Sequence, residues 1–311
     1  MPQGDLRVLL LSRDEPLATV VSGRRTGFSG QMSTSPTSAM PKIPCTVGIL
    51  TLNSAATLER CLTSVRDFAE VIVFDGNSTD GTQDIARRFG ARVVPQVESA
   101  EQNVRITDFA ATRNRLFTFV TQPWFFDLDS DEIMSEALRD QIRTAVAGQP
   151  AAYSVPRRAI VNGTVVRHAF LYPDRYIRLY PMVAGVGFHP KKALHEKILL
   201  PQDLPVRSLD APVLAPWPSY ADARAKDERY LALVAAEVVT PQRGLRRKLL
   251  KSALVNLAKG IHIGLVSVAI GIRYGGRDVL SIKHWSRFVR YHWRIGLLRM
   301  RQTFRRYGAS S

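Results

Sequence analysis

The sequence predicts an α/β protein with a mostly parallel, Rossmann-like sheet, a smaller antiparallel part and basic helices at the C-terminus. Three observations support this. Buried-strand and amphipathic-helix patterns alternate from Cys45 to Asp129. Antiparallel strand patterns follow, with Asn162-Gly163 between two of them. Residues 241–311 then carry 16 Lys and Arg against one acid, Asp278, and so nearly all of the net charge of +16.

The first half of the chain alternates strictly between strands and helices. The expected strands are 46–51, 70–75, 91–95 and 123–129, and the expected helices are 55–68, 82–90 and 108–120. Such alternation predicts a parallel sheet, with ligands outside the carboxyl ends of its strands. Polar segments follow three strand ends, at 51–54, 75–82 and 127–132, and we expect them to meet in one crevice.

The second half changes pattern and sets the expected domain boundaries. Residues 152–168 predict two strands joined by a tight Asn-Gly turn, 174–182 another strand and 219–239 a helix. Residues 1–43 are rich in Ser, Thr, Gly and Pro without periodicity, which predicts a disordered extension. We therefore expect a catalytic domain over 44–240 and a basic helical region over 241–311.

The fourth strand ends in four acids, Asp127, Asp129, Asp131 and Glu132. Like charge at this density needs compensation. Asp129 and Asp131 offer the hard oxygen ligands that suit Mg²⁺ or Mn²⁺, which bind one or two carboxylates together with substrate phosphates. The simpler alternative is a solvated acidic turn that caps a helix beginning near Ser135.

Two further positions favour a nucleotide site. Asp75 ends an apolar strand, where an acid is well placed to accept hydrogen bonds from a base or ribose. Arg113 precedes the acidic strand on a helix and could serve phosphate or carboxylate. The alternatives are that the polar loop after Asp75 only caps the next helix, and that Arg113 is a surface residue.

These motifs resemble a known family. The segment "TLNSAATLERCLTSVRDFAEVIVFDGNSTDGTQDIARRFGARVV", the pair "RN" at 113–114 and "WFFDLDSDE" are similar to the family 2 inverting glycosyltransferases of GT-A fold. The later segments "VPRR", "NG", "YPDRYIRLY" and "LHEKI" resemble the bacterial branch that builds lipopolysaccharide core. The resemblance covers residues 44–240.

The resemblance implies a role for each matching residue. It assigns Thr51, Asn53 and Asp75 to the base and ribose, Arg113 and Asn114 to nucleotide support, Asp129 to ribose or metal, Asp131 to the metal, Asp174, Arg175 and Arg178 to the acceptor or diphosphate, Glu196 to the general base, and His195 to orienting that base or binding metal or phosphate. Trp217 stands near where this branch often has His.

The implied reaction is metal-dependent, inverting transfer of a sugar from a nucleoside diphosphate donor, UDP being favoured, to a hydroxyl of a lipid-linked glycan. A polyprenyl-phosphate glycosyltransferase is one alternative, but the segment "LHE" favours a hydroxyl acceptor. A non-catalytic membrane or nucleic-acid adaptor on the same fold is another, and the retained Asp75, Asp129 and Asp131 argue against it.

The basic C-terminal region predicts contact with a membrane surface. Apolar residues recur at helical spacing, and arginines lie largely off that stripe; the residues expected at the membrane are Trp285, Arg290, Trp293 and Arg294. Residues 261–272 are too short an apolar run to span a bilayer. We expect peripheral attachment to the inner face of the bacterial cytoplasmic membrane and no nucleic-acid partner. The alternatives are a helix packed on the catalytic domain and nucleic-acid binding.

Overall fold

The computed structural model describes residues 41–189, 198–236 and 244–304. Its strands are β1 (Ile43–Thr51), β2 (Phe68–Asp75), β3 (Arg92–Pro95), β4 (Trp124–Asp129), β5 (Ile133–Met134), β6 (Ala152–Val161), β7 (Thr164–Val165), β8 (Arg175–Pro181), β9 (Gly187–Phe188), β10 (Ile198–Leu199), β11 (Val206–Ser208) and β12 (Val213–Pro216). Its helices are α1 (Ala55–Ser64), α2 (Thr82–Arg88), α3 (Phe109–Phe117), α4 (Glu136–Val146), α5 (Tyr220–Ala236), α6 (Leu245–Arg273) and α7 (Ile282–Phe304).

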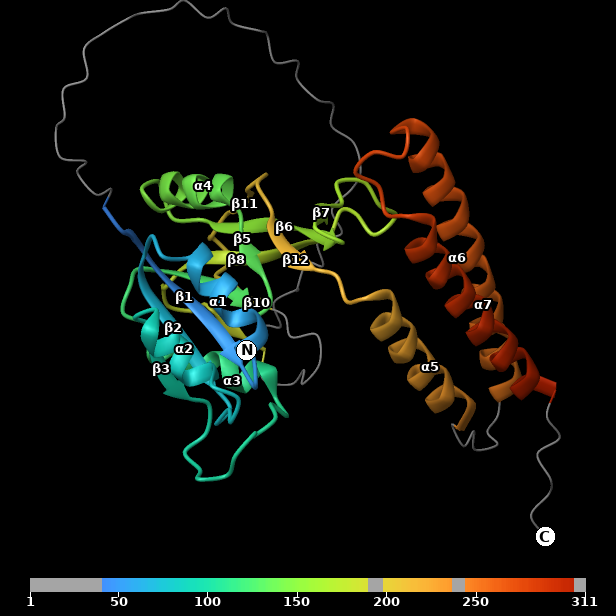
Figure 1. The fold of residues 1–311 in the computed structure, drawn as a ribbon, viewed down its shortest axis with the longest axis horizontal. Helices are drawn as coiled ribbons and strands as arrows, with labels where there is room; N and C mark the ends of the chain where they lie inside the picture. The colour runs from blue at the N-terminus through green and yellow to red at the C-terminus, as the bar shows by residue number, and fades with distance from the viewer. Residues whose placement is uncertain (1–40, 190–197, 237–243, 305–311) are drawn as a thin grey trace, which may run out of the picture. The chain divides into compact units, whose positions relative to one another are not determined.

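The parallel half of the main sheet has the order β3-β2-β1-β4 (Figure 1). All three of its strand pairs are parallel, as the alternation of strands and helices predicted. The register places Thr51 opposite Asp75, and Leu50 opposite Asp129. The loops after β1, β2 and β4 therefore begin at one edge of the sheet, which confirms their expected convergence.

The antiparallel half continues the same sheet. β8 pairs antiparallel with β4, and β6 pairs antiparallel with β8. The hairpin from β6 to β7 turns at Asn162 and Gly163, both with positive φ, 51° and 79°, as a tight Asn-Gly turn requires. The predicted fold class, a mostly parallel sheet with antiparallel strands and C-terminal helices, is confirmed.

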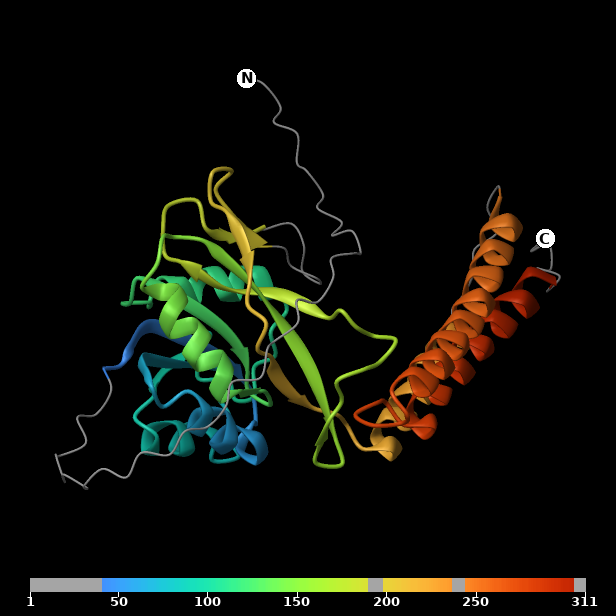
Figure 2. The same cartoon turned by 90° about the horizontal axis from the view of Figure 1, so that it is seen from above.

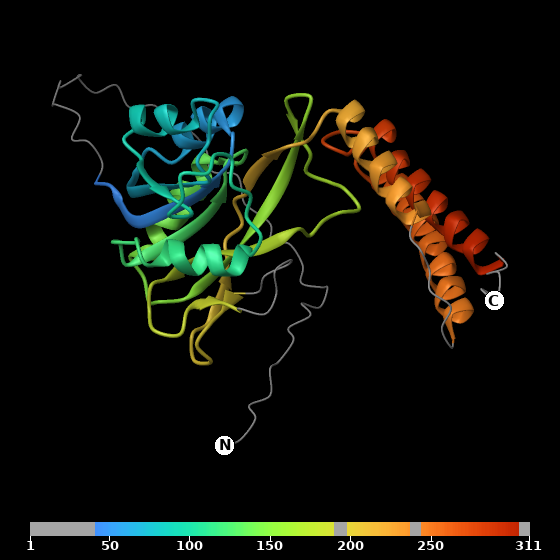
Figure 3. The same cartoon turned by 90° about the horizontal axis from the view of Figure 1, so that it is seen from below.

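Helices cover both faces of the parallel strands (Figure 3). On one face, α1, α2 and α4 bury residues such as Leu58, Ala86 and Leu138 against the sheet. On the other face, α3 packs Leu116 against Phe125. Gly48 of β1 leaves room for the Phe125 ring, because an added Cβ at Gly48 would lie 2.3 Å from Phe125 Cζ. The strand that leads to Thr51 is thus fixed from both sides.

The first strand begins earlier than the sequence analysis expected. β1 starts at Ile43, whose side chain is fully buried, so residue 43 belongs to the sheet and not to the predicted disordered extension. Its backbone N–H donates to the carbonyl of Asp67 at 2.8 Å. Residues 1–40 of that extension lie outside the part of the chain that the structure describes.

The C-terminal region contains an antiparallel pair of long helices, α6 and α7 (Figure 2). Contacts run in reverse order along the two chains: Gly264 lies against Val289, and Gly260 against Trp293. A Cβ on Gly260 would lie 2.2 Å from Trp293 Cδ1. Val289 and Trp293, two members of the apolar stripe that the sequence assigns to a membrane, therefore lie where α7 packs on α6. Leu297 and Phe304 of the same stripe are 49% and 76% exposed.

The arginine side of α7 lies along α5. Arg287 pairs with Asp227 and Arg294 pairs with Glu228. Arg290 Nη2 donates to the Tyr220 hydroxyl at 2.8 Å. Acids of α5 thus compensate Arg287 and Arg294, and Arg294 is one of the two arginines expected at the membrane.

α6 is longer than the apolar run 261–272 suggested. It spans Leu245–Arg273, and an 18-residue window within it has a mean hydropathy of 1.7. By length and composition alone, this helix meets the criterion for crossing a membrane. Only 22% of that window is buried inside the protein, so most of its apolar surface is left uncovered.

Candidate active site

Asp75 is the most tightly held of the predicted nucleotide residues. Its carboxylate is 1% exposed and accepts hydrogen bonds from Thr51 Oγ1 at 2.7 Å and Gln83 Nε2 at 2.9 Å. Ser78 donates twice, from its backbone N–H at 2.8 Å and from its hydroxyl at 2.6 Å. Four donors fix the orientation of both oxygens, so this carboxylate is a rigid feature of the sheet edge.

Asn53 links the loops that follow β1 and β2. Its φ is 51°, and its side-chain oxygen accepts from the Thr79 N–H at 3.0 Å. Its Nδ2 donates to Asn103 Oδ1 at 2.9 Å. The predicted base and ribose residues Thr51, Asn53 and Asp75 therefore share one edge, although Thr51 and Asp75 are buried and Asn53 is exposed.

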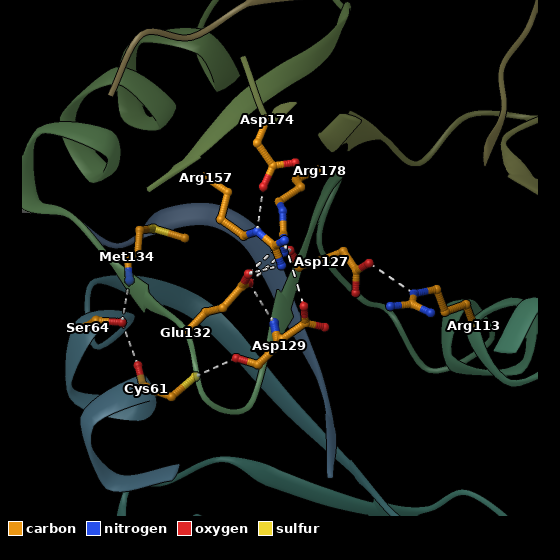
Figure 4. A network of polar contacts seen from close by, with 10 residues as sticks. All are labelled: Cys61, Ser64, Arg113, Asp127, Asp129, Glu132, Met134, Arg157, Asp174 and Arg178. Carbon is orange, nitrogen blue, oxygen red and sulfur yellow. Dashed lines mark hydrogen bonds and ion pairs between the residues drawn. The ribbon is translucent and has the colours of Figure 1, made fainter. Parts of the chain in front are cut away.

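Arginines compensate two of the four acids at the end of β4 (Figure 4). Arg113 Nε lies 2.9 Å from Asp127 Oδ2, and both side chains are largely buried. Arg178 grips Glu132 with both terminal nitrogens, at 2.7 and 2.9 Å, and the Glu132 side chain is 1% exposed. Paired, hydrogen-bonded geometry of this kind is what makes a buried charge tolerable.

Glu132 is a structural residue to which the sequence analysis gave no role. Burial, together with the nearby Asp129 carboxylate, raises the pKa of Glu132 to about 7, against the opposing effect of Arg178. Its Oε2 also accepts the Asp129 backbone N–H at 3.2 Å, which closes the turn after β4. The sequence signal for this role was the presence of four acids at one strand end, which indicates that a positive side chain must compensate some of them.

The two acids left for a ligand are Asp129 and Asp131. The Asp129 side chain is 48% exposed and lies 3.8 Å from Arg178, and Asp131 is exposed. Burial against the protein and the neighbouring acids raise the pKa of Asp129, while Arg178 and Arg113 oppose this. The Ser54 and Ser130 hydroxyls, 3.0 Å apart, join this turn to the loop after β1.

A divalent cation fits this pair of carboxylates. Within the described ranges, no group of three or more His, Cys, Asp or Glu side chains could hold a metal ion. Mg²⁺ and Mn²⁺ do not need such a group, because they typically bind one or two carboxylates and take their remaining ligands from water and substrate phosphates. Asp131 forms no ion pair with a described residue, and the ion pair of Asp129 with Arg178, at 3.8 Å, is longer than those of Asp127 and Glu132.

An arginine-rich cavity of about 560 Å³ opens beside these acids. Its lining includes Asp129 and four arginines, Arg113, Arg157, Arg175 and Arg178. All four have partners within the protein. Arg113 pairs with Asp127, Arg157 with Asp174 and Arg178 with Glu132. Arg175 Nη2 donates to the carbonyls of Ser154 at 2.9 Å and Leu209 at 2.6 Å. Arg175 and Arg178 therefore shape the cavity wall, whatever substrate contact they also make.

Asp174 and Asn114 hold other parts of this wall. Asp174 Oδ2 accepts from Arg157 Nε at 3.0 Å, and Arg157 Nη1 also lies 3.9 Å from Glu132. Asn114 exchanges two hydrogen bonds with the backbone of Phe188, at 2.9 and 2.8 Å, and so fixes β9 against α3. The predicted nucleotide-supporting residue Asn114 is thus a positioning residue in this structure.

His195 and Glu196, the predicted catalytic pair, lie outside the described residues. The nearest described strands are β9 and β10, which pair antiparallel through Phe188 and Ile198. Both of these residues line the arginine-rich cavity. The role of Glu196 as general base remains a prediction.

Removing the charge of Glu132 should destabilise the protein strongly. In Glu132→Gln, the buried Arg178 guanidinium loses its charged partner, and we expect a loss of about 3–5 kcal/mol in the free energy of unfolding. Urea unfolding followed by circular dichroism measures it. The matched control is Asp84→Asn, which breaks the exposed pair with Arg87 and should cost less than about 1 kcal/mol. Equal stability of the two variants would contradict the assigned role of Glu132.

Comparison with known proteins places the domain in a family. Residues 46–197, just under half of the chain, match the family model described as glycosyl transferase family 2. The chain is 31% identical over 159 residues to the SPbeta prophage-derived glycosyltransferase SunS of Bacillus subtilis, a match that covers 50% of this chain and 35% of SunS. It is 29% identical over 131 residues to the lipopolysaccharide core biosynthesis glycosyltransferase LpsC of Rhizobium meliloti, covering 40% of this chain and 46% of LpsC.

Among solved structures, S. aureus TarS 1–349 in complex with UDP is similar at 16% identity and a TM-score of 0.43, over 83% of this chain and 91% of that chain. The chain spans between a third and a half of the length of the two curated relatives named above. The match to the family model includes the edge formed by Thr51, Asp75, Asp129 and Asp131. Residues 46–197 are a family 2 glycosyltransferase domain.

Proposed function

We propose that the protein is a metal-dependent, inverting glycosyltransferase that uses a nucleoside diphosphate sugar, UDP-linked, and a hydroxyl acceptor on a lipid-linked glycan. One observation carries this proposal. Arginines engage Asp127 and Glu132 closely, while Asp129 and Asp131 stay available at the sheet edge beside the arginine-rich cavity. If the acidic turn served only to cap α4, there would be no reason to pair two of its acids with arginine and leave two exposed. Ser135 already caps that helix.

The chain's own residues divide the work of binding. Buried Asp75 and Thr51 hold the sheet edge at which exposed Asn53 would contact the base and ribose, and Asp129 and Asp131 would hold the divalent cation. When bound, the cation would supply Lewis-acid neutralisation of the diphosphate. Arg157, which is 37% exposed, lies on the cavity wall and adds positive charge for the same phosphates.

The transfer is a single displacement. The acceptor hydroxyl oxygen forms a bond to the anomeric carbon, and the bond from that carbon to the diphosphate oxygen breaks, so the nucleoside diphosphate leaves with the bonding pair. The hydroxyl proton passes to a general base, for which we propose the Glu196 carboxylate. Attack opposite to the leaving group inverts the anomeric configuration.

Asp131 is the residue whose removal tests the metal proposal. In Asp131→Ala, we expect UDP affinity in saturating Mn²⁺ to fall at least about tenfold, because the cation loses one of its two protein carboxylates. Isothermal titration calorimetry measures the affinity. Asp140→Ala on α4, also an exposed acid, is the control and should bind as the unmodified protein does. Unchanged affinity in Asp131→Ala would remove the proposed cation site.

The variant Glu196→Gln tests whether Glu196 acts in the transfer step and not in donor binding. The amide cannot accept the hydroxyl proton, so we expect turnover to fall by about a hundredfold or more while donor affinity stays within about twofold. Donor screening with UDP-, GDP- and dTDP-sugars comes first, and product formation is then followed with the sugar that binds. Near-normal turnover in this variant would show that another group is the base.

We also propose that the protein attaches to an anionic membrane surface through α6. Exposed apolar side chains recur along α6 at intervals of three, four or seven residues: Leu250, Leu254, Ile261, Leu265, Val268 and Ile272. This set, the α6 apolar face, lies on one side of a helix. Arg246, Arg247 and Lys248 precede it and Arg273 follows it, which suits anionic lipid headgroups.

The pairing of α6 with α7 favours a helix lying in the membrane interface over one that spans the bilayer. Because the two helices run antiparallel, Arg287, Arg290 and Arg294 of α7 lie alongside the apolar part of α6. A spanning α6 would draw these arginines into the bilayer, at a cost of about 2.5–3.5 kcal/mol for each one near the centre. With only the α6 apolar face inserted, the arginines keep their α5 partners.

A charge on the α6 apolar face should weaken membrane binding. In Leu265→Glu, where the side chain is 68% exposed, we expect co-sedimentation with vesicles of phosphatidylglycerol and phosphatidylcholine to fall about tenfold. The matched control is Leu233→Glu on α5, which is 67% exposed and outside the face. Equal loss in both variants would point to a general effect of charge and contradict the assignment to α6.

A further inference from the structure

A second cavity, of about 550 Å³, lies on the other side of the acidic turn. Asp131 and Glu132 line it at one end, and Arg157 lines both cavities. Asp129 lines the first cavity and Asp131 lines the second, so each cavity has one of the two proposed cation ligands in its wall. Nothing in the roles derived above uses the second cavity.

Aromatic side chains from distant parts of the chain build one side of this second cavity. Trp217 follows β12, and Phe288 comes from α7; their ring centroids are 6.2 Å apart with an interplanar angle of 62°. Tyr172 also lines it, and its hydroxyl is fixed because it donates to the Val166 carbonyl at 3.0 Å and accepts the Ala159 N–H at 3.0 Å. Hydrogen bonds therefore hold the Tyr172 ring in place before any ligand arrives.

Two polar groups of this cavity have no partner in the described part of the chain. The Trp217 Nε1 atom is buried and makes no hydrogen bond there. Lys226 of α5 lines the cavity, is exposed and forms no ion pair with a described residue. A buried donor without an acceptor is costly, and such groups in native proteins call for an explanation, of which a bound ligand is one.

We propose that this second cavity binds a pyranose ring of the acceptor glycan, an assignment that rests on the proposed function. A sugar ring has an apolar C–H face, which suits Trp217 and Phe288, and hydroxyls, which can accept from Lys226. An acyl chain fits less well, because the carboxylates, Arg157 and Lys226 would lose hydration without gaining a polar partner. The position beside Asp131 puts an acceptor next to the donor's diphosphate.

The site would also give α5 and α7 a direct role in recognition. Lys226 and Phe288 come from these helices, while Trp217 and Tyr172 come from the sheet domain. Acceptor recognition and the helices that carry the α6 apolar face would thus be parts of one structure.

The test measures the binding of methyl glucoside, methyl galactoside and methyl mannoside by saturation-transfer difference NMR, with and without UDP and Mn²⁺. We expect at least one glycoside to bind the unmodified protein, about tenfold more weakly to Trp217→Ala, and with intermediate affinity to Trp217→Phe, which keeps an aromatic face. Lys226→Ala, an exposed change that leaves the core intact, should weaken the same glycoside about threefold. Thermal unfolding and near-UV circular dichroism check the fold of each variant.

The matched control is Tyr230→Ala, which removes an aromatic ring of α5 that is 50% exposed and outside the cavity. It should bind the glycoside as the unmodified protein does. The proposal is overturned if no glycoside binds, or if Trp217→Ala and Lys226→Ala both bind as tightly as Tyr230→Ala. UDP affinity, measured separately by calorimetry, distinguishes this failure from failure of the proposed function. If the protein binds UDP but no glycoside, only the assignment of the acceptor site is wrong.

Discussion

The buried pair of Arg178 and Glu132 is the interaction on which the site depends. Its two hydrogen bonds, at 2.7 and 2.9 Å, neutralise one acid of the turn after β4 inside the protein. Because Glu132 also accepts the Asp129 N–H, the same pair sets the backbone of that turn. Arg113 neutralises Asp127 in a similar way. The protein thereby holds four acids at one strand end while leaving Asp129 and Asp131 for a ligand, and a cation with phosphates is the ligand that their chemistry suits.

The sheet register turns this local arrangement into a site. Thr51 stands opposite Asp75, and Leu50 stands opposite Asp129, so the polar ends of three parallel strands lie side by side. The antiparallel strands β8 and β6 then extend the sheet beyond β4 and bring Arg178 and Arg157 to the same acids. Both cavities follow from this extension, since each is lined by residues of β6 together with the acidic turn.

The C-terminal helices show how packing changes the meaning of an amphipathic pattern. Val289 and Trp293 of α7 pack on α6, where Gly260 leaves room for Trp293, and Arg287 and Arg294 of α7 reach acids of α5. α6 remains with an uncovered row of apolar side chains. By its sequence pattern α7 resembles a membrane-surface helix, but it lies between α5 and α6. Its neighbour α6 has the exposed row of apolar side chains.

The sequence by itself determined the fold class, the order of the main strands and helices, the Asn162-Gly163 turn and the edge where Thr51, Asp75 and Asp129 meet, because hydrophobic period, turn chemistry and strand order are local or nearly local properties. It did not determine which of the four acids are available, since that depends on Arg113 and Arg178, far from them along the chain. It also could not assign the exposed face of the helices or the second cavity around Trp217 and Phe288. Those features arise from side chains brought together across long sequence separations, and only tertiary packing decides which charges are paired and which apolar surfaces are covered.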